Sequence, residues 1–453
     1  MILLLSATFS YNFYQTDYKL LVNSPLKKSY IGDEVWYVSA SRNLLREAFH
    51  MYPYSPNATL KFKSSVDLAK FNGFYALKYG IKYVQPYKRI KNAEYGIGND
   101  PSKIRQLIYD KNKYGLVIVQ PGWKYPDKAG ILNYLNLEHP PLAKYFIMHQ
   151  IMVKDVPMSW RVPSMVLGSL VVFIVPVALL LATDSFWLSL LALLLLYLDE
   201  PLRVMSMVAM LDIYAAAFSA FSYAALLFEP YTATLLYALA SSSKYTAFFY
   251  LIPIAYVFWL ERKKSPGGSF LRPLITFLVV LTLVSMPIIL GLGFKKWLDN
   301  LIGGIKWFLV SRPTGPPPSN PWDWIMGKGK VPLALKPMLE VYTNSAIMQV
   351  ALIAFFLLLP LRKRKLYRAS WLASLYLVSA LVGFQIIYWL GNHTLYAFYT
   401  VVFTPFADVA AAGVAILLAN YGDVYESLEW WGRLVVNVWD WLWGRRRLEC
   451  ELV

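Results

Sequence analysis

The stretch Val166–Ala182 reads V-L-G-S-L-V-V-F-I-V-P-V-A-L-L-L-A and holds no charged residue. Runs of roughly 17–25 apolar residues cross a bilayer as helices, because a helix satisfies its own backbone hydrogen bonds. Similar runs recur through most of residues 161–420. The chain of 453 residues is 57% hydrophobic and 16% charged, whereas soluble domains carry about 25% charged residues. The sequence therefore predicts an all-α, multi-pass membrane protein.

Around this stretch we expect about ten transmembrane helices. The first, residues 1–14, is either a short span or the remainder of a longer one, because it lacks the basic start and the cleavage site of a signal peptide. The other expected spans are 161–183, 185–199, 204–228, 230–243, 244–260, 272–292, 345–361, 370–390 and 393–419.

The basic residues orient these spans. Clusters at 262–264, 362–365 and 445–447 follow hydrophobic runs, and short Lys/Arg-rich loops stay in the cytoplasm. Two spans within 230–260 place all three clusters on one side and the long loop 15–160 on the other, whereas a single span there breaks this agreement. The net charge of +17 thus follows from topology, and we do not expect nucleic-acid binding.

The long extracytoplasmic loop contains a region of different character. Residues 59–130 combine strand-like alternation at Leu60–Lys63 and Leu116–Gln120 with a helical stretch near Pro101–Lys111. Loops beyond about 15 residues are usually functional. We therefore expect a small α/β insertion inside a functional outer loop, 15–160.

Two further segments lie at the membrane surface. The second extracytoplasmic loop, 293–344, is rich in proline and tryptophan, and tryptophan favours the membrane–water interface. The tail, 420–453, has the tryptophans and arginines of an amphipathic cytoplasmic helix. Cys450 is the single cysteine of the chain, which excludes an intrachain disulfide and a cysteine-rich metal site.

With this topology, charged side chains that are distant in sequence gather on the outward face. Asp212 is the most informative, because an aspartate inside a span costs about 2.5–3.5 kcal/mol and usually marks a cavity or a partner. Taken singly, Arg161 and Lys244 could reach lipid headgroups. The full set is Asp33, Glu34, Glu138, His139, Lys144, Arg161, Asp212, Lys244 and His393.

Several motifs around these residues resemble the protein O-mannosyltransferases of the GT-C superfamily of membrane glycosyltransferases. They are G-D-E-V-W at 32–36, H-P-P-L-A-K at 139–144, W-R-V-P-S-M-V-L-G at 160–168, M-L-D-I-Y-A-A-A-F at 210–218 and S-S-S-K-Y-T-A-F-F at 241–249. P-W-D-W at 321–324 is similar to a Pro-Trp-x-Trp element of that family. The resemblance covers roughly residues 20–410 and includes the order and the side of every motif.

The resemblance implies a GT-C fold, a polyprenyl- or dolichyl-phosphate sugar as donor and a Ser/Thr hydroxyl of exported protein as acceptor, with mannose the sugar expected. It implies that Asp33 removes the proton of the acceptor hydroxyl, which is a poor nucleophile without a base. The departing phosphate needs cations, for which Arg161 and Lys244 are the candidates. Supporting residues are Glu34, Glu138 and His139, and the cavity is expected to include Asp212, His393, Trp322 and Trp324.

The sequence departs from the family in two places. The usual D-x-H-P-P becomes Leu137-Glu138-His139, which also resembles the E-K-P-P of the aminoarabinose transferases of lipid A. The second outer loop is too short for the soluble domain of eukaryotic members, which favours a prokaryotic or archaeal plasma-membrane enzyme.

Alternatives to protein glycosylation remain open from the sequence. The chain could transfer sugar to a lipid or glycan acceptor, or it could be a flippase or transporter for a lipid-linked sugar. Asp33, Glu138 and His139 could hold a divalent ion, but the resemblance requires no metal, and we expect no cofactor beyond the lipid-phosphate co-substrate.

Overall fold

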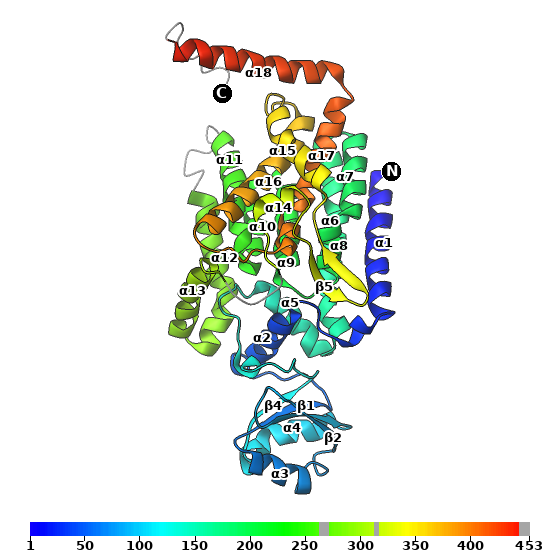
Figure 1. Cartoon of the computed structure of the whole chain (residues 1–453), viewed down its shortest axis with the longest axis vertical. Helices are drawn as coiled ribbons and strands as arrows, with labels where there is room; N and C mark the ends of the chain where they lie inside the picture. Colours follow the sequence, from blue (N-terminus) through cyan, green and yellow to red (C-terminus); the bar gives the residue numbers. More distant parts are fainter. Residues whose placement is uncertain (262–270, 312–316, 444–453) are drawn as a thin grey trace.

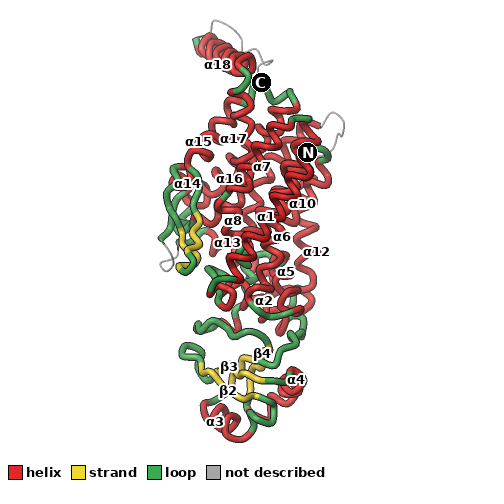
Figure 2. The backbone as a smooth tube through the Cα atoms, turned by 90° about the vertical axis from the view of Figure 1, so that its right-hand side faces the viewer, coloured by secondary structure: helices red, strands yellow, loops and turns green. Residues whose placement is uncertain are grey.

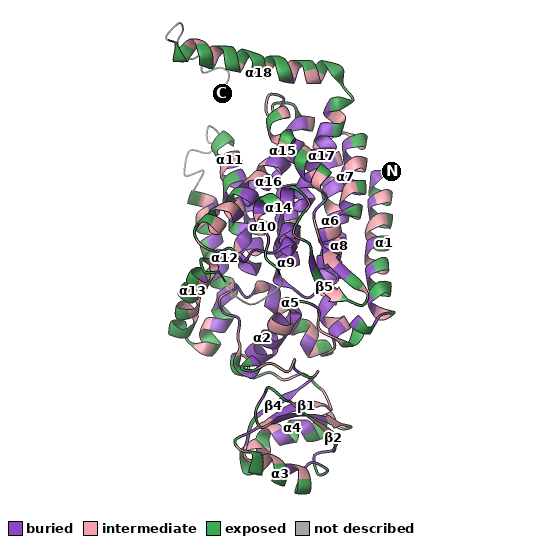
Figure 3. Cartoon of the chain, in the orientation of Figure 1, coloured by how far each residue is buried: buried purple, intermediate pink, exposed green. Residues whose placement is uncertain are grey.

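The computed structural model describes residues 1–261, 271–311 and 317–443. They form a long helical bundle with a small α/β domain at one end and the helix α18 (Tyr421–Leu442) across the other (Figures 1 and 2). The basic clusters expected at 262–264 and 445–447 lie outside the described residues. Buried residues concentrate between the helices, whereas α18 is mostly exposed (Figure 3).

Three described helices are long and apolar enough to cross a membrane: α6 (Pro157–Thr183), α12 (Leu271–Leu292) and α16 (Lys365–Trp389). A fourth span arises if α17 (Thr404–Leu418) is joined to α18, although the two are bent by 104°. These helices are compatible with a membrane protein, and the mostly helical fold agrees with the sequence. Their number is smaller than the roughly ten spans expected from hydropathy.

The difference has a physical cause, because several expected spans are broken into shorter helices. The expected span 204–228 is interrupted at residues 207–210, where α8 has ended at Ser206 and α9 has not begun. Residues 393–403 are loop and 3-10 helix, so the last expected span becomes α-helical only at Thr404. The shorter elements are α7 (Phe186–Leu198), α8 (Glu200–Ser206), α9 (Leu211–Leu226), α10 (Pro230–Ser243), η4 (Tyr245–Tyr250), α11 (Leu251–Glu261), α15 (Ser345–Leu357) and η5 (Ala397–Val402).

Two boundaries are informative. The sequence predicted a division near residue 244, and α10 does end at Ser243, with η4 following Lys244. The first helix, α1 (Ile2–Val22), is longer than the expected 1–14. It continues past Asp17 because this buried carboxylate accepts hydrogen bonds from Arg203 and Ser206 on α8.

The α/β domain has the element order β-α-β-β-α-β and a four-stranded antiparallel sheet of order β2-β3-β1-β4, a split βαβ arrangement. Its strand and helix positions agree with the alternation and the helical stretch seen in the sequence. The elements are β1 (Ala58–Phe62), α3 (Ser65–Phe74), β2 (Ile81–Pro86), β3 (Ala93–Gly98), α4 (Pro101–Asp110), η2 (Lys111–Tyr114) and β4 (Leu116–Pro121).

A buried ion pair fixes this domain to the bundle. Arg42 donates from Nε and Nη2 to the two oxygens of Asp155, at 2.8 Å each. Asp155 also accepts from the indole of Trp160 and from the backbone N–H of Trp123, in the segment that leaves β4. A bidentate pair with its remaining lone pairs satisfied is the favourable form of a buried ion pair, and it sets the distance between sheet and helices.

The remaining elements are short, and of these α2 (Glu34–Glu47) lies at the end of the bundle next to the α/β domain, whereas α14 (Pro321–Ile325) lies beside the middle of the bundle (Figures 1 and 2). The hairpin β5–β6 was not expected, and its two strands pair antiparallel within residues 331–341. These elements are η1 (Pro25–Lys28), α2 (Glu34–Glu47), η3 (Ile131–Asn133), α5 (Leu142–Val153), α13 (Phe294–Phe308), α14 (Pro321–Ile325), β5 (Val331–Leu335) and β6 (Met338–Val341).

Candidate functional site

The acidic motif lies at the start of α2, near the hairpin β5–β6. Gly32 has a φ of +51°, a conformation that glycine adopts without strain. A side chain at this position would meet Leu333 of β5 at 3.2 Å and Met210 at 3.4 Å. Asp33 follows as the partly buried N-cap residue of α2. The tight turn thus places Gly32, directly before Asp33, against the hairpin and the start of α9.

Glu34 forms a fully buried ion pair with Arg161. The guanidinium donates from Nε to Oε1 at 2.7 Å and from Nη2 to Oε2 at 2.6 Å. Arg161 also donates to the carbonyls of Leu26 and Ser29, and Glu34 accepts the backbone N–H groups of Ile31 and Ala209. Both charges therefore have dense hydrogen bonding, which gives the pair a structural role. The expected role of Arg161 as a phosphate ligand stays a prediction.

A second buried pair joins Lys244 to Asp212. Lys244 Nζ lies 2.5 Å from Asp212 Oδ1, and Asp212 Oδ2 has no hydrogen-bond partner among the described residues. The ammonium also lies 4.4 Å from the centre of the Tyr399 ring, within cation–π range. The break between α10 and η4 brings the lysine to the first turn of α9.

Tyr37 connects the two acidic positions. Its side chain is buried, and burial raises the pKa of the phenol well above 10, with further increases from the charges of Asp33 and Asp212. Both carboxylates therefore lie close enough to act on one hydroxyl. The phenol stays neutral at physiological pH and can donate a hydrogen bond there.

The HPPL segment packs against the same cluster. Asn136, in the left-handed region with φ 51°, donates to Glu138 at 2.9 Å, and the Tyr134 hydroxyl also donates to Glu138. Burial raises the pKa of Tyr134, and the charges of Glu138 and Asp33 raise it further. The charges of Glu138 and Asp33 thus act on one phenol, and their placement on one side of a membrane stays a prediction.

Lys144 stabilises the HPPL segment through hydrogen bonds to its backbone. Its ammonium donates to the carbonyl and side-chain oxygens of Asn136 and, at 2.9 Å, to the carbonyl of His139. The side chain is fully buried, and this burial lowers the pKa of Lys144 to about 7. The two prolines end the loop, and α5 begins directly after Pro141.

Helix α13 covers His139. The buried imidazole makes edge contacts with Trp307 at 5.4 Å and Phe308 at 5.8 Å between ring centres. Gly304 allows this approach, because a Cβ there would lie 2.7 Å from the carbonyl oxygen of Glu138. The expected surface loop therefore contains a helix that closes one side of the polar cluster.

An apolar groove of about 450 Å³ adjoins Lys244. Its walls come from η4, α12, α13 and α16, and almost all of them are hydrocarbon or aromatic. Tyr245 and Thr246 line it directly after Lys244, and Phe308 both lines it and contacts His139. We define the apolar groove by Tyr245, Phe248, Phe277, Leu281, Ile305, Phe308 and Ile387.

The other expected cavity residues occupy different environments. His393 lies in the loop before η5, with its ring 4.5 Å from that of Tyr388. Trp324 is fully buried against Phe384 and donates from its indole to Ser319. Trp322 is 61% exposed. These contacts of His393 and Trp324 are to residues outside the acidic cluster, which we define by Asp33, Glu34, Glu138 and Asp212. A cavity role for His393, Trp322 and Trp324 therefore stays a prediction.

Sequence reasoning missed the tyrosines and the amide that join the motifs. Tyr37 follows G-D-E-V-W directly, and Asn136 precedes L-E-H-P-P, so proximity to a motif was the available signal. Tyr399 gave no such signal, because it stands in a run read as part of a span. Among the described residues, no three His, Cys, Asp or Glu side chains gather as a metal-binding group.

Comparison with known proteins gives no relative: no family model, no curated protein and no solved structure matches the chain.

Proposed function

We propose that the chain is an inverting membrane glycosyltransferase, which transfers a sugar from a polyprenyl phosphate to a Ser or Thr hydroxyl of exported protein. The observation that carries the proposal is the junction of three features. Lys244, a buried cation, directly precedes two residues of the apolar groove and pairs with Asp212. The charges of Asp212 and of the partly buried Asp33 both act on the phenol of Tyr37. A lipid-linked sugar phosphate has an apolar chain, an anionic phosphate and a reacting sugar carbon in the same order.

In this proposal the lipid chain occupies the apolar groove and the phosphate approaches Lys244. Part of that cation's field is already neutralised by Asp212, so donor binding would shift the ammonium from its carboxylate toward the phosphate. Charge-assisted hydrogen bonds to phosphate are roughly twice as strong as neutral ones. The phenol of Tyr399, stacked beneath the ammonium, keeps the lysine at this position.

The chemical step then follows from the two charges. Asp33 accepts the proton of the acceptor hydroxyl as its oxygen forms a bond to the anomeric carbon. The bond from that carbon to the phosphate oxygen breaks, and the electron pair leaves with the polyprenyl phosphate, whose charge the lysine offsets. Attack from the face opposite the phosphate inverts the anomeric centre.

The proposal includes a membrane arrangement finer than the three long helices. We propose that broken pairs such as α7 with α8 complete further spans, giving about ten in a GT-C arrangement in a prokaryotic or archaeal plasma membrane. The acidic cluster would then face outward. Cysteine-accessibility mapping tests this, because Cys450 is the single native cysteine and can be replaced by serine.

The decisive assay uses the purified full chain with radiolabelled polyprenyl-phosphate mannose and separate peptide, lipid and glycan acceptors. We expect labelled peptide whose new glycosidic bond has the opposite anomeric configuration to the donor. Labelled lipid or glycan instead would correct the acceptor class. Donor movement across vesicles without any labelled acceptor would favour a flippase.

A further inference from the structure

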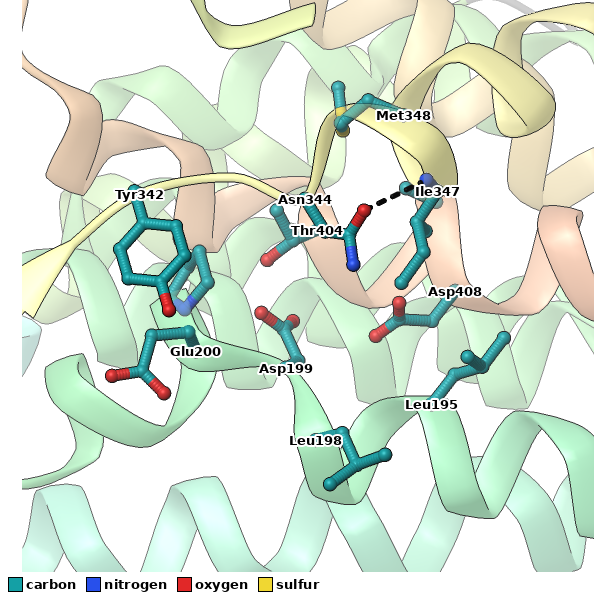
Figure 4. A pocket seen from close by; sticks show the side chains of 12 residues that line it. Leu195, Leu198, Asp199, Glu200, Tyr342, Asn344, Ile347, Met348, Thr404 and Asp408 are labelled. Carbon is teal, nitrogen blue, oxygen red and sulfur yellow. Dashed lines mark hydrogen bonds between the residues drawn. The ribbon is translucent and has the colours of Figure 1, made fainter. Parts of the chain in front are cut away.

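A second polar cavity lies at the break between α7 and α8, and it shares no residue with the acidic cluster around Asp33 (Figure 4). Its volume is about 260 Å³. The walls come from the α7–α8 junction, the segment between β6 and α15, and α17. Its polar lining consists of Asp199, Glu200, Tyr342, Asn344, Thr404 and Asp408.

Two aspartates from different helices face each other across this cavity. Asp199 is 7% exposed and Asp408 is 2% exposed, and Figure 4 shows both carboxylates directed toward the same space. Asp408 Oδ2 has no hydrogen-bond partner among the described residues, and the hydroxyl of Thr404 interacts with the Asp199 carboxylate on the other side of the cavity. Unpaired acceptors of this kind are costly when buried.

Other polar atoms of the lining, in Asp199 and Asn344, cap helices and do not fill the cavity. Asp199 Oδ1 caps α8 by accepting from the Leu202 N–H at 3.3 Å, which directs Oδ2 elsewhere. Asn344 caps α15 through the N–H groups of Ala346 and Ile347 (Figure 4). The described lining contains no lysine, arginine or histidine. Two buried carboxylates thus lack a protein cation at the place where both need one.

We propose that this cavity binds one hydrated divalent cation of the Mg²⁺ type, held by Asp199 and Asp408 with the hydroxyl of Thr404 beside them. No three acidic or histidine side chains converge in the described chain, so water must supply the other ligands. This matches the coordination preference of Mg²⁺, which keeps several water ligands and binds to one or two carboxylates. A water occupies about 30 Å³, so the cavity holds an ion with several of them.

The cation would stabilise the helices and the hairpin that pack against the acidic cluster. It joins the α7–α8 break to α17 at the junction that leads from β6 into α15. The segment after α8 contains Ala209, whose N–H donates to Glu34, and Leu333 of β5, in the hairpin that ends with β6, lies next to Gly32. The inference concerns a structural site and does not depend on the proposed glycosyl transfer.

The test uses the full chain purified in detergent, stripped with EDTA and titrated with MgCl₂ alone. We expect a rise in Tm that saturates, with one bound Mg²⁺ per chain by equilibrium dialysis. Asp199→Asn and Asp408→Asn should each lose both responses. Asp299→Asn, an exposed carboxylate on α13, is the matched control and should keep them.

Other outcomes overturn the proposal. If Mg²⁺ leaves the wild-type Tm unchanged and both asparagine variants are more stable, the two acids share a proton and no ion binds. If Asp33→Asn abolishes the rise in Tm with Mg²⁺ while Asp408→Asn keeps it, the ion binds at the acidic cluster around Asp33 and not in this cavity. Should the cavity variants fail to fold, dialysis of the wild-type chain decides, since absence of bound Mg²⁺ contradicts the proposal.

Discussion

The two buried ion pairs near Asp33 look alike in composition but differ in their surroundings. Glu34–Arg161 is enclosed by backbone donors and acceptors on every side. Asp212–Lys244 has an unpartnered carboxylate oxygen, an aromatic face and the apolar groove beside it. The first pair has no capacity for a new ligand without losing an existing bond. The second has such capacity, which is why donor binding is assigned there.

The largest effect is expected from removing one charge of the enclosed pair. Arg161→Met leaves Glu34 buried without a cation, and breaking such a pair costs about 3–5 kcal/mol. We expect a large fall in thermal stability, measured in detergent. The double variant Glu34→Gln/Arg161→Met should recover much of the loss. A stable Arg161→Met chain that fails only in donor binding would instead make Arg161 a phosphate ligand.

A matched double variant of the open pair should behave differently. Asp212→Asn/Lys244→Met removes both charges, so stability should change little. Loss of one charge-assisted contact costs about 1.5–3 kcal/mol, so donor binding should weaken about tenfold to a hundredfold. Titration with a fluorescent polyprenyl phosphate measures this. Equal donor affinity in the two double variants would remove the distinction between the pairs.

A smaller effect is expected from Lys144 and depends on pH. Burial lowers its pKa to about 7 in the folded chain, below the usual value near 10.4 of the unfolded chain. Between these values the unfolded state binds more protons, so stability should rise with pH from about 7 to 10. Hydrogen bonds from the ammonium offset part of the burial penalty, so we expect about 1–2 kcal/mol.

Chemical denaturation of wild type and Lys144→Met across that pH range measures the difference, and the rise should be absent from the variant. An identical slope in both would show that the three oxygen acceptors hold the lysine charged throughout.

The smallest effect is expected at Trp322. This side chain is 61% exposed, and exposed substitutions usually change stability by less than about 0.5 kcal/mol. Trp322→Ala should therefore keep the Tm of the wild type, whereas Trp324→Ala removes a fully buried indole at a cost of about 3–5 kcal/mol. Similar losses in both variants would place Trp322 in a packed environment.

The sequence alone was sufficient to predict structure where a local pattern determines it. The uncharged run Val166–Ala182 identified α6, and basic-loop asymmetry predicted the break at Lys244. It also predicted one site for Asp33, Asp212 and Glu138, which stays a prediction. The charges of Asp33 and Asp212 act on Tyr37, and those of Asp33 and Glu138 on Tyr134.

The helix lengths and the buried ion pairs depend on contacts between residues distant in sequence, which no local sequence pattern predicts. Asp17 continues α1 only because Arg203 and Ser206 reach it from α8. Hydropathy overestimated the long helices because short breaks, such as residues 207–210 between α8 and α9, interrupt apolar runs without reducing their mean hydropathy. The pairing of Glu34 with Arg161 joins residues 127 positions apart.

The central claim is that Asp33 takes the acceptor proton while Lys244 holds the donor. The most direct measurement compares Asp33→Asn with wild type in single-turnover transfer of radiolabelled mannose to peptide, alongside donor affinity in the same preparations. Glu47→Gln, an exposed acid on the same helix α2, is the control. We predict that Asp33→Asn loses transfer by at least about a hundredfold and binds donor as wild type does. Undiminished transfer by Asp33→Asn would contradict the account.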